Sequence, residues 1–274
     1  MRHICKCTSQ VYDSRGELDL RQIANSGQCF RLKEYATDKF IAVTGSHAVD
    51  IHRRGDVYIF WCDAKEFQAV WAPYFDLDTD YKGFKSKMQD DPFLKDALKT
   101  GGGIRILRQD LWEMAVTFTI SQRNNIPRIA QSVEALCENF GTPLREIGGR
   151  QVYAFPTADQ LLWPDLSVAS LGYREPYIKG LCSQGDTVWQ SLPNLDDAQA
   201  KKKLLDMKGI GEKVANCIML FGLHRMDSYP RDVWVNRLID DVYHGDFDPG
   251  KYAGFAGYVQ QLQFYYYRNK TFSF

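Results

Sequence analysis

The spacing of hydrophobic residues changes along the chain, from runs typical of strands to a repeat typical of helices. Residues 1–75 are predicted to be mostly β-strand, because β-branched and aromatic residues gather there in short runs. These runs are residues 40–43, 48–51 and 57–61, separated by the turn sequences Thr44-Gly45-Ser46 and Arg53-Arg54-Gly55-Asp56. We therefore expect an antiparallel meander.

After about residue 80 the apolar positions follow the helical period. The clearest repeat lies in residues 129–140, with Pro127 near the first turn and Gly141 just past the end. Asp110 and Thr157 are expected helix caps. Further helices are predicted over residues 111–120, 196–206, 212–223 and 233–242.

Strands followed by helices indicate an α+β protein. We expect an antiparallel β domain in residues 1–92 and a mostly helical body in residues 93–274. No window approaches the ~18 apolar residues of a membrane span, and the first residues lack the apolar core of a signal peptide. An intracellular monomer without a membrane partner is the expectation.

The net charge and the cysteine content limit which functions and metal sites the protein can have. The formal net charge is zero, whereas nucleic-acid binders are often basic, so the balance argues weakly against DNA as a partner. Backbone amides at a helix start bind phosphate without charged side chains, however. The seven cysteines, an odd number, are expected to be reduced and buried. Cys5-x-Cys7 is too isolated for a metal site, and the absence of cysteine after Asp232 excludes a C-terminal iron–sulfur cluster.

A short turn, Gly209-Ile210-Gly211, joins two predicted helices. Glycines permit a positive φ and leave the amides uncovered, and these amides would start the second helix. We expect Ile210 to tuck inward. The segment is typical of a helix-hairpin-helix that binds a DNA phosphate without sequence preference. The alternative is a plain corner between two helices.

Lys213 and Asp232 follow this turn and suggest chemistry. A free lysine has a pKa of ~10.4 and is a poor nucleophile, but a helix N-terminus and partial burial disfavour its charged form. A neutral Lys213 amine could then attack the anomeric carbon of a nucleotide. Asp232 could stabilise the sugar cation. The alternatives are a solvated surface lysine and a simple helix cap. Cys217 shares a helix face with Lys213, either as a soft pocket wall or as a core residue.

Four ordered blocks make the chain similar to the 8-oxoguanine DNA glycosylases of the helix-hairpin-helix superfamily. The blocks are Leu18-Asp19-Leu20 with Ser26-Gly27-Gln28-Cys29-Phe30-Arg31, residues 106–110 with residues 121–129, Leu171-Gly172-Tyr173-Arg174, and the hairpin with Asp232. The resemblance implies an N-terminal antiparallel sheet domain and two helical subdomains flanking an active-site cleft. It also implies base excision followed by β-elimination, on double-stranded DNA that contains oxidised guanine, without a cofactor or metal.

The resemblance also implies roles for single residues. Lys213 would be the nucleophile and Schiff-base lysine, and Asp232 the essential carboxylate. In the lesion-base pocket, the backbone carbonyl of Gly27 would read the N7 hydrogen that 8-oxoguanine has and guanine lacks. Cys217 would stack on the flipped base, and Phe264 or Gln261 would close the pocket.

Other residues are implied to contact the DNA around the lesion. Asn125 would lie near the lesion, Arg128 and Arg174 would contact the orphaned cytosine, and Tyr173 would wedge the duplex. The phosphate hairpin would comprise Gly209, Ile210, Gly211 and Lys213. The purely structural alternatives are helix capping for Asn125, surface charge for both arginines and a core position for Tyr173.

The sequence departs from the family pattern at four positions. Lys208 replaces a proline of the hairpin, and Arg231 replaces a small apolar residue before Asp232. Arg123 replaces the first residue of an asparagine run, and Trp234 replaces a histidine that contacts phosphate. These changes bear on opposite-base selectivity and on the tightness of the lesion pocket more than on excision.

Two other functions remain open from the sequence. A glycosylase for alkylated bases would generally lack the lysine at position 213. A non-catalytic DNA-binding protein would use the hairpin alone, with a steep salt dependence and no covalent intermediate.

Overall fold

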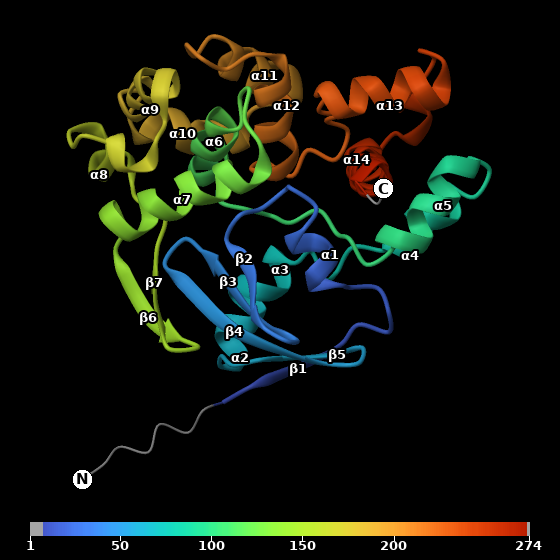
Figure 1. Cartoon of the computed structure of the whole chain (residues 1–274), viewed down its shortest axis with the longest axis horizontal. Coiled ribbons are helices and arrows are strands. Elements are labelled where there is room, and N and C mark those ends of the chain that lie inside the picture. The colour runs from blue at the N-terminus through green and yellow to red at the C-terminus, as the bar shows by residue number, and fades with distance from the viewer. Residues whose placement is uncertain (1–7, 273–274) are drawn as a thin grey trace.

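The N-terminal part of the computed structural model, which describes residues 8–272, is a five-stranded antiparallel sheet (Figure 1). Its strand order is β1-β5-β4-β3-β2. The strands are β1 Gln10–Asp13, β2 Leu32–Ala36, β3 Lys39–Thr44, β4 His47–Arg54 and β5 Val57–Phe60. The predicted meander is confirmed, and its two tight turns fall where the glycines are.

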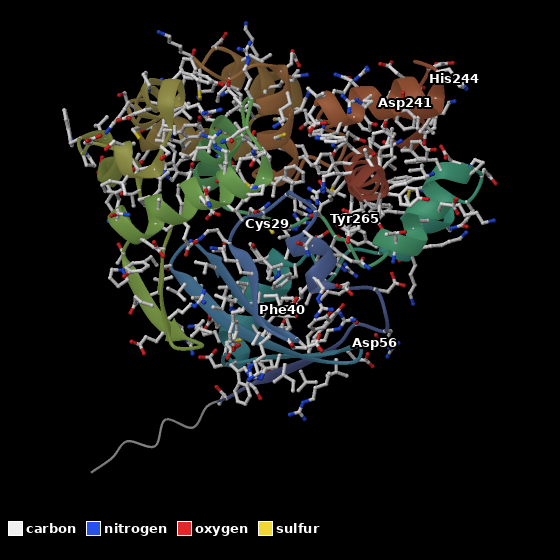
Figure 2. All side chains as sticks on the ribbon, in the orientation of Figure 1. Cys29, Phe40, Asp56, Asp241, His244 and Tyr265 are labelled. Carbon is white, nitrogen blue, oxygen red and sulfur yellow. The ribbon has the colours of Figure 1, made fainter. Side chains whose placement is uncertain are left out.

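One face of the sheet is buried because alternate residues point inward. Phe40, Ile51, Tyr58 and Phe60 are fully buried, as the period of two requires. Figure 2 labels Phe40 and Asp56 in the sheet domain; Phe40 is fully buried, whereas Asp56 lies exposed in the β4–β5 turn.

The prediction of strand up to residue 75 is wrong for residues 64–74. They form helical turns, α2 Ala64–Glu66, η1 Phe67–Trp71 and α3 Ala72–Tyr74. Asp63 caps the first turn by accepting a hydrogen bond of 2.8 Å from the Glu66 amide. Phe67 and Trp71, spaced by four, both pack into the core of the sheet domain, because that spacing places them on one helix face.

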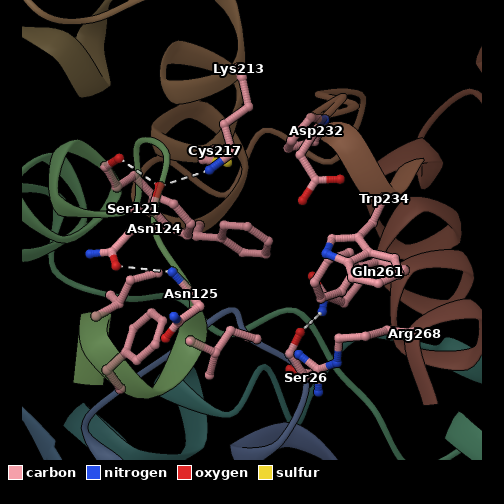
Figure 3. Close-up of a pocket in the computed structure, with 18 of the residues that line it drawn as sticks. Ser26, Ser121, Asn124, Asn125, Lys213, Cys217, Asp232, Trp234, Gln261 and Arg268 are labelled. Atoms are coloured by element: carbon pink, nitrogen blue, oxygen red, sulfur yellow. Dashed lines mark hydrogen bonds between the residues drawn. The ribbon is translucent and has the colours of Figure 1, made fainter. Parts of the chain in front are cut away.

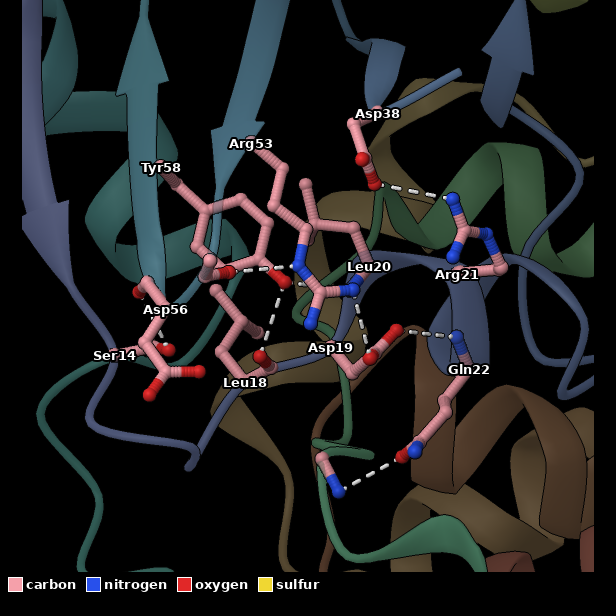
Figure 4. A network of polar contacts seen from close by, with 12 residues as sticks. Ser14, Leu18, Asp19, Leu20, Arg21, Gln22, Asp38, Arg53, Asp56 and Tyr58 are labelled. Atoms are coloured by element: carbon pink, nitrogen blue, oxygen red, sulfur yellow. Dashed lines mark hydrogen bonds and ion pairs between the residues drawn. The ribbon is translucent and has the colours of Figure 1, made fainter.

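A short helix, α1 Leu20–Ala24, is anchored to the sheet by polar contacts (Figure 4). The Tyr58 hydroxyl donates to the Leu18 carbonyl at 3.1 Å, and Arg53 donates to the Asp19 carboxylate at 3.0 Å. The other Asp19 oxygen caps α1. Because α1 leads directly into Ser26 and Gly27, these contacts fix the start of the segment that reaches the functional site.

The rest of the chain is mostly helical. Its elements are α4 Tyr81–Ser86, α5 Pro92–Gly101, α6 Leu111–Ile120, α7 Ile126–Phe140, α8 Ala158–Leu162, η2 Ser167–Ala169, η3 Gly172–Arg174, α9 Glu175–Cys182, α10 Asp186–Ser191, η4 Leu192–Asn194, α11 Asp197–Leu205, α12 Glu212–Phe221, α13 Val233–Tyr243, η5 Pro249–Tyr252 and α14 Ala256–Phe272. The expected caps Asp110 and Thr157 are confirmed, since each accepts a hydrogen bond from an amide of the first turn.

The expectation of helix throughout this part is wrong for one hairpin, β6 Pro143–Ile147 and β7 Arg150–Tyr153. Gly148 and Gly149 have φ values of 59° and 75°, which the tight two-residue turn between the strands requires. Ile147 and Val152 pack on Val43 and Ala48 of the first sheet. The hairpin therefore joins the helical body to the sheet.

The last helix, α14, lies against α5 and α13 at the edge of the helical body (Figure 1). Most of its first ten residues are buried, so it has no polar stripe from which a helix could be recognised. The division after residue 92, which is the first residue of α5, and the two helical subdomains stay predictions.

Candidate active site

A cavity of about 490 Å³ opens between α12, α13, α14 and the loop before α7. This size is typical of ligand pockets. Residues from the whole length of the chain line it: Ser26, Gly27, Phe30, Phe118, Ser121, Asn124, Asn125, Ile126, Pro127, Ile129, Lys213, Cys217, Phe221, Pro230, Asp232, Trp234, Gln260, Gln261, Phe264 and Arg268. It thus brings together Gly27, Asn125, Lys213, Cys217 and Asp232 of the predicted site residues, and both candidates for closing the pocket, Gln261 and Phe264.

The hairpin beside the cavity has the predicted helix-hairpin-helix form. Gly209 has a φ of 95°, and a Cβ there would lie 2.5 Å from the Tyr177 ring, so only glycine fits. Gln122 donates to the Gly209 carbonyl at 2.8 Å. Ile210 is buried, as expected. Gly211 is the N-cap of α12 and has open space around it, which leaves the first amides of α12 without a side-chain cap.

Lys213 lies in the first turn of α12 with its amine in the cavity (Figure 3). The amine donates to the Ser121 hydroxyl at 2.8 Å and lies 5.3 Å above the centre of the Phe118 ring. Ser121 in turn donates to the Phe118 carbonyl at 2.7 Å, so its oxygen is left to accept from Lys213. The alternative of a solvated surface lysine is wrong.

Cys217 lies one turn further along α12 and is buried. Burial raises the pKa of its thiol to about 11, with Lys213 opposing the shift and Asp232 adding to it. The thiol is therefore protonated at neutral pH and chemically quiet. Such a side chain suits the wall of an apolar pocket better than a nucleophile.

Asp232 is the N-cap of α13, as the simpler interpretation predicted. One carboxylate oxygen accepts a hydrogen bond of 2.8 Å from the Val235 amide. The carboxylate nonetheless points into the same space as the Lys213 amine (Figure 3), and the buried Pro230 precedes it. Capping therefore holds the carboxylate in place at the cavity.

The turn at Gly27 forms the opposite wall. Gly27 has a φ of 78°, and a Cβ there would lie 3.1 Å from Ile126 and 3.3 Å from Phe264. The side-chain amides of two glutamines hold this turn in place. Gln261 donates to the Ser26 carbonyl at 2.6 Å, and the side chain of the buried Gln28 bonds to the backbone of residues 105 and 107.

Three polar residues of the cavity were missed by the sequence reasoning. Ser121 pairs with Lys213, as described above. Gln260 is buried, and its side-chain oxygen has no hydrogen-bond partner among the described residues. Arg268 approaches Gly27 from the far end of α14. Neither α14 residue belongs to a recognisable motif; only the aromatic density of the segment marked it.

The predicted opposite-base residues gather beside the cavity rather than inside it. Arg128 and Arg174 line an adjoining cavity of about 260 Å³. Arg174 donates to the carbonyls of Gln122, at 2.8 Å, and Arg123, at 3.1 Å. Tyr173 also donates to Gln122, at 3.1 Å. Together these contacts fix the loop that carries Arg123, whose φ is 46°.

The structure bears on the alternative interpretations of Tyr173 and Asn125. Tyr173 is 51% exposed, so the alternative of a core position is wrong. Asn125 does cap α7, because its side chain accepts a hydrogen bond of 3.0 Å from the Arg128 amide. Asn125 also lines the cavity.

The cysteines and possible metal ligands give no further site. Of the described cysteines, Cys29, Cys62, Cys137, Cys182 and Cys217 are all free and buried, and Cys5 and Cys7 lie outside the described residues. Within residues 8–272, no three His, Cys, Asp or Glu side chains gather where they could hold a metal ion. Across the same residues, no helix combines the length and apolar character needed to cross a membrane.

Comparison with known proteins agrees with this geometry. Residues 11–115 match the family described as "8-oxoguanine DNA glycosylase, N-terminal domain". The N-glycosylase/DNA lyase of Saccharomyces cerevisiae is 30% identical over 266 residues, covering 84% of this chain and 69% of the relative.

Two solved structures share the fold over nearly the full length. The Clostridium acetobutylicum 8-oxoguanine glycosylase/lyase, bound to double-stranded DNA with cytosine opposite 8-oxoguanine, is 31% identical, with a TM-score of 0.85 and 93% of each chain covered. MBOgg1, bound to a low-affinity DNA ligand, is 32% identical, with a TM-score of 0.91 and 97% of each chain covered. The chain belongs to the 8-oxoguanine DNA glycosylase family of DNA glycosylase/lyases.

Proposed function

We propose that the protein excises 8-oxoguanine from duplex DNA and then cuts the strand at the abasic site, with Lys213 as nucleophile. The observation that carries the proposal is the cavity into which the Lys213 amine and the Asp232 carboxylate both point. A base must leave the duplex stack to reach such a cavity. The family relationship supports the lesion and the two-step outcome.

The chemistry follows from the placement of the two side chains. As the glycosidic bond breaks, the capped Asp232 carboxylate stabilises the positive charge that develops on the sugar. The Lys213 amine attacks C1′, and opening of the sugar ring gives a Schiff base. Loss of a C2′ proton then expels the 3′ phosphate by β-elimination. Ser121 orients the amine before attack.

Recognition of the base falls to the walls of the cavity. The Gly27 carbonyl accepts the N7 hydrogen of 8-oxoguanine, which guanine does not have. Cys217 and Phe264 contact the two faces of the flipped base. The unpaired side-chain oxygen of Gln260 accepts a hydrogen bond from the Watson–Crick edge, since a buried acceptor gains most from a partner brought by the ligand.

The surface around the cavity holds the distorted duplex. Tyr173 wedges the stack, and Arg128 and Arg174 face the orphaned cytosine. The open amides after Gly211 bind a phosphate on the same duplex. We expect the protein to act as a monomer and inside the cell, where its DNA substrate is found.

Single-turnover assays on duplexes with one 8-oxoguanine opposite each of the four bases test this proposal. Wild-type protein is compared with Lys213→Gln, and with Lys202→Gln as a matched control, because Lys202 is exposed on α11 outside the cavity. We expect free 8-oxoguanine and a cut strand from the wild type and the control, and no cut strand from Lys213→Gln. No release of 8-oxoguanine by the wild type would contradict the proposal.

A further inference from the structure

Arg268 lies on α14, one turn after Phe264, with its guanidinium at the wall of the cavity (Figure 3). Its Nη2 donates to the Asn25 carbonyl at 2.5 Å, and the guanidinium carbon lies 5.3 Å from the centre of the Phe264 ring. These two contacts fix the group. A Cβ built on Gly27 would lie 3.7 Å from Nη1, so Nη1 lies beside the residue whose carbonyl is proposed to read N7.

Nη1 is buried and has no hydrogen-bond partner among the described residues. Leaving a buried charged donor unpaired is unfavourable. Burial lowers the pKa of Arg268 from its ordinary value, although Tyr265 and Asp232 partly compensate. An apolar side chain would fill this position without that penalty. The unpaired donor is explained if its acceptor arrives with the ligand.

We propose that Arg268 Nη1 donates a hydrogen bond to an exocyclic oxygen of the flipped base, which makes Arg268 a specificity-determining residue. The inference rests on the function proposed above, in which the Gly27 carbonyl accepts the N7 hydrogen. The oxygens on C6 and C8 of 8-oxoguanine flank N7, so a donor beside Gly27 reaches one of them. The positive charge also stabilises the negative charge that the base gathers as it leaves.

The two oxygens have different consequences for specificity. The oxygen on C8 is absent from guanine, so a bond to it would add to the discrimination that N7 provides. The oxygen on C6 is replaced by an amino group in 8-oxoadenine, so a bond to it would exclude oxidised adenine, because two donors would face each other.

The test compares Arg268→Met with Lys270→Met, which removes a positive charge from an exposed position on the same helix. Each variant is assayed for single-turnover excision of 8-oxoguanine opposite cytosine and for cleavage of a duplex with a preformed abasic site. We expect Arg268→Met to slow excision by about 10- to 100-fold. Cleavage at the abasic site should stay within about twofold of the wild type, because no base is present to contact. Lys270→Met should resemble the wild type in both assays.

Binding to uncleavable 2′-fluoro duplexes distinguishes the two oxygens. An equal loss of affinity for 8-oxoguanine and 8-oxoadenine in Arg268→Met assigns the bond to the C8 oxygen. A loss confined to 8-oxoguanine assigns it to the C6 oxygen.

Two results would overturn the inference: excision by Arg268→Met at the wild-type rate, or an equal loss of excision and abasic-site cleavage, which indicates a structural role. Failure of the proposed function itself shows separately, as wild-type protein that releases no 8-oxoguanine.

Discussion

Replacing Gly27 with alanine adds a single methyl group to the wall of the cavity that is proposed to recognise the base. Gly27 has a φ of 78°, where an L-residue is strained. The added Cβ would lie 3.1 Å from Ile126 and 3.3 Å from Phe264, closer than ordinary carbon contacts. Both neighbours are side-chain ends that can move by a few tenths of an ångström. The fold should survive, but the wall that meets the N7 edge of the base is displaced.

The size of the effect follows from the hydrogen bond that is lost. Strain at Gly27 should lower the free energy of unfolding by about 1 kcal/mol. Pulling the carbonyl away from the N7 hydrogen leaves a buried donor unpaired, which costs about 2 to 3 kcal/mol in the transition state for excision. That loss corresponds to a rate about 30- to 160-fold lower.

Gly45→Ala is the matched control. Gly45 has a φ of 52° in the β3–β4 turn and nothing within 4 Å of a built Cβ, so it shares the strain without touching the cavity. Urea unfolding should give similar losses of stability for both variants, while single-turnover excision of 8-oxoguanine falls only in Gly27→Ala. Cleavage of a preformed abasic site should persist in both. Equal excision rates for the two variants would show that the Gly27 turn does not recognise the base.

Three further predictions follow from the geometry. Asp232→Asn should keep the cap of α13, because asparagine caps as well as aspartate, yet lower excision by about 100-fold or more; unchanged excision would remove Asp232 from the chemistry. Arg128→Met should weaken the preference for cytosine in the four-duplex assay, and Arg174→Met should weaken it too while also slowing excision opposite every base, because it releases the loop at residues 122–123; a preference for cytosine that neither variant weakens would contradict the role of the two arginines. Burial raises the pKa of Glu113 to about 8, although the charge of Arg31 opposes the shift. The protonated carboxyl therefore stabilises the fold fully below the unfolded pKa of ~4.3, and this stabilisation is lost as pH rises towards 8. Glu113→Gln should therefore raise Tm relative to the wild type more at pH 9 than at pH 5, and an equal shift at both pH values would show that this carboxyl does not bind its proton more tightly in the folded state.

Local sequence signals predicted the elements that depend on local physics. The β3–β5 meander follows from alternation and glycine turns, and α7 from its apolar period between Asn125 and Gly141. Lys213 and Asp232 could be singled out because each stands at a helix start. The glycine turn before α12 and the capping aspartate before α13 are both local signals.

The remaining features depend on tertiary contacts that short windows do not contain. The sequence around Trp71 favours strand because aromatic residues are enriched in strands, but it folds as helical turns that pack Phe67 and Trp71 into the core of the sheet domain. Helix α14 is buried around most of its first turns and lacks amphipathic spacing. The contact between Arg268 and the Asn25 carbonyl spans nearly the whole chain, so no sequence window could place Arg268 beside Gly27.

The proposed mechanism requires Lys213 to form the covalent bond to the sugar. Borohydride reduction during reaction with an 8-oxoguanine duplex, followed by protease digestion and mass spectrometry of the crosslinked peptide, identifies the residue that forms it. We expect a single adduct on Lys213 and none in Lys213→Gln. An adduct on another amine, or excision of the base without any adduct, would contradict it.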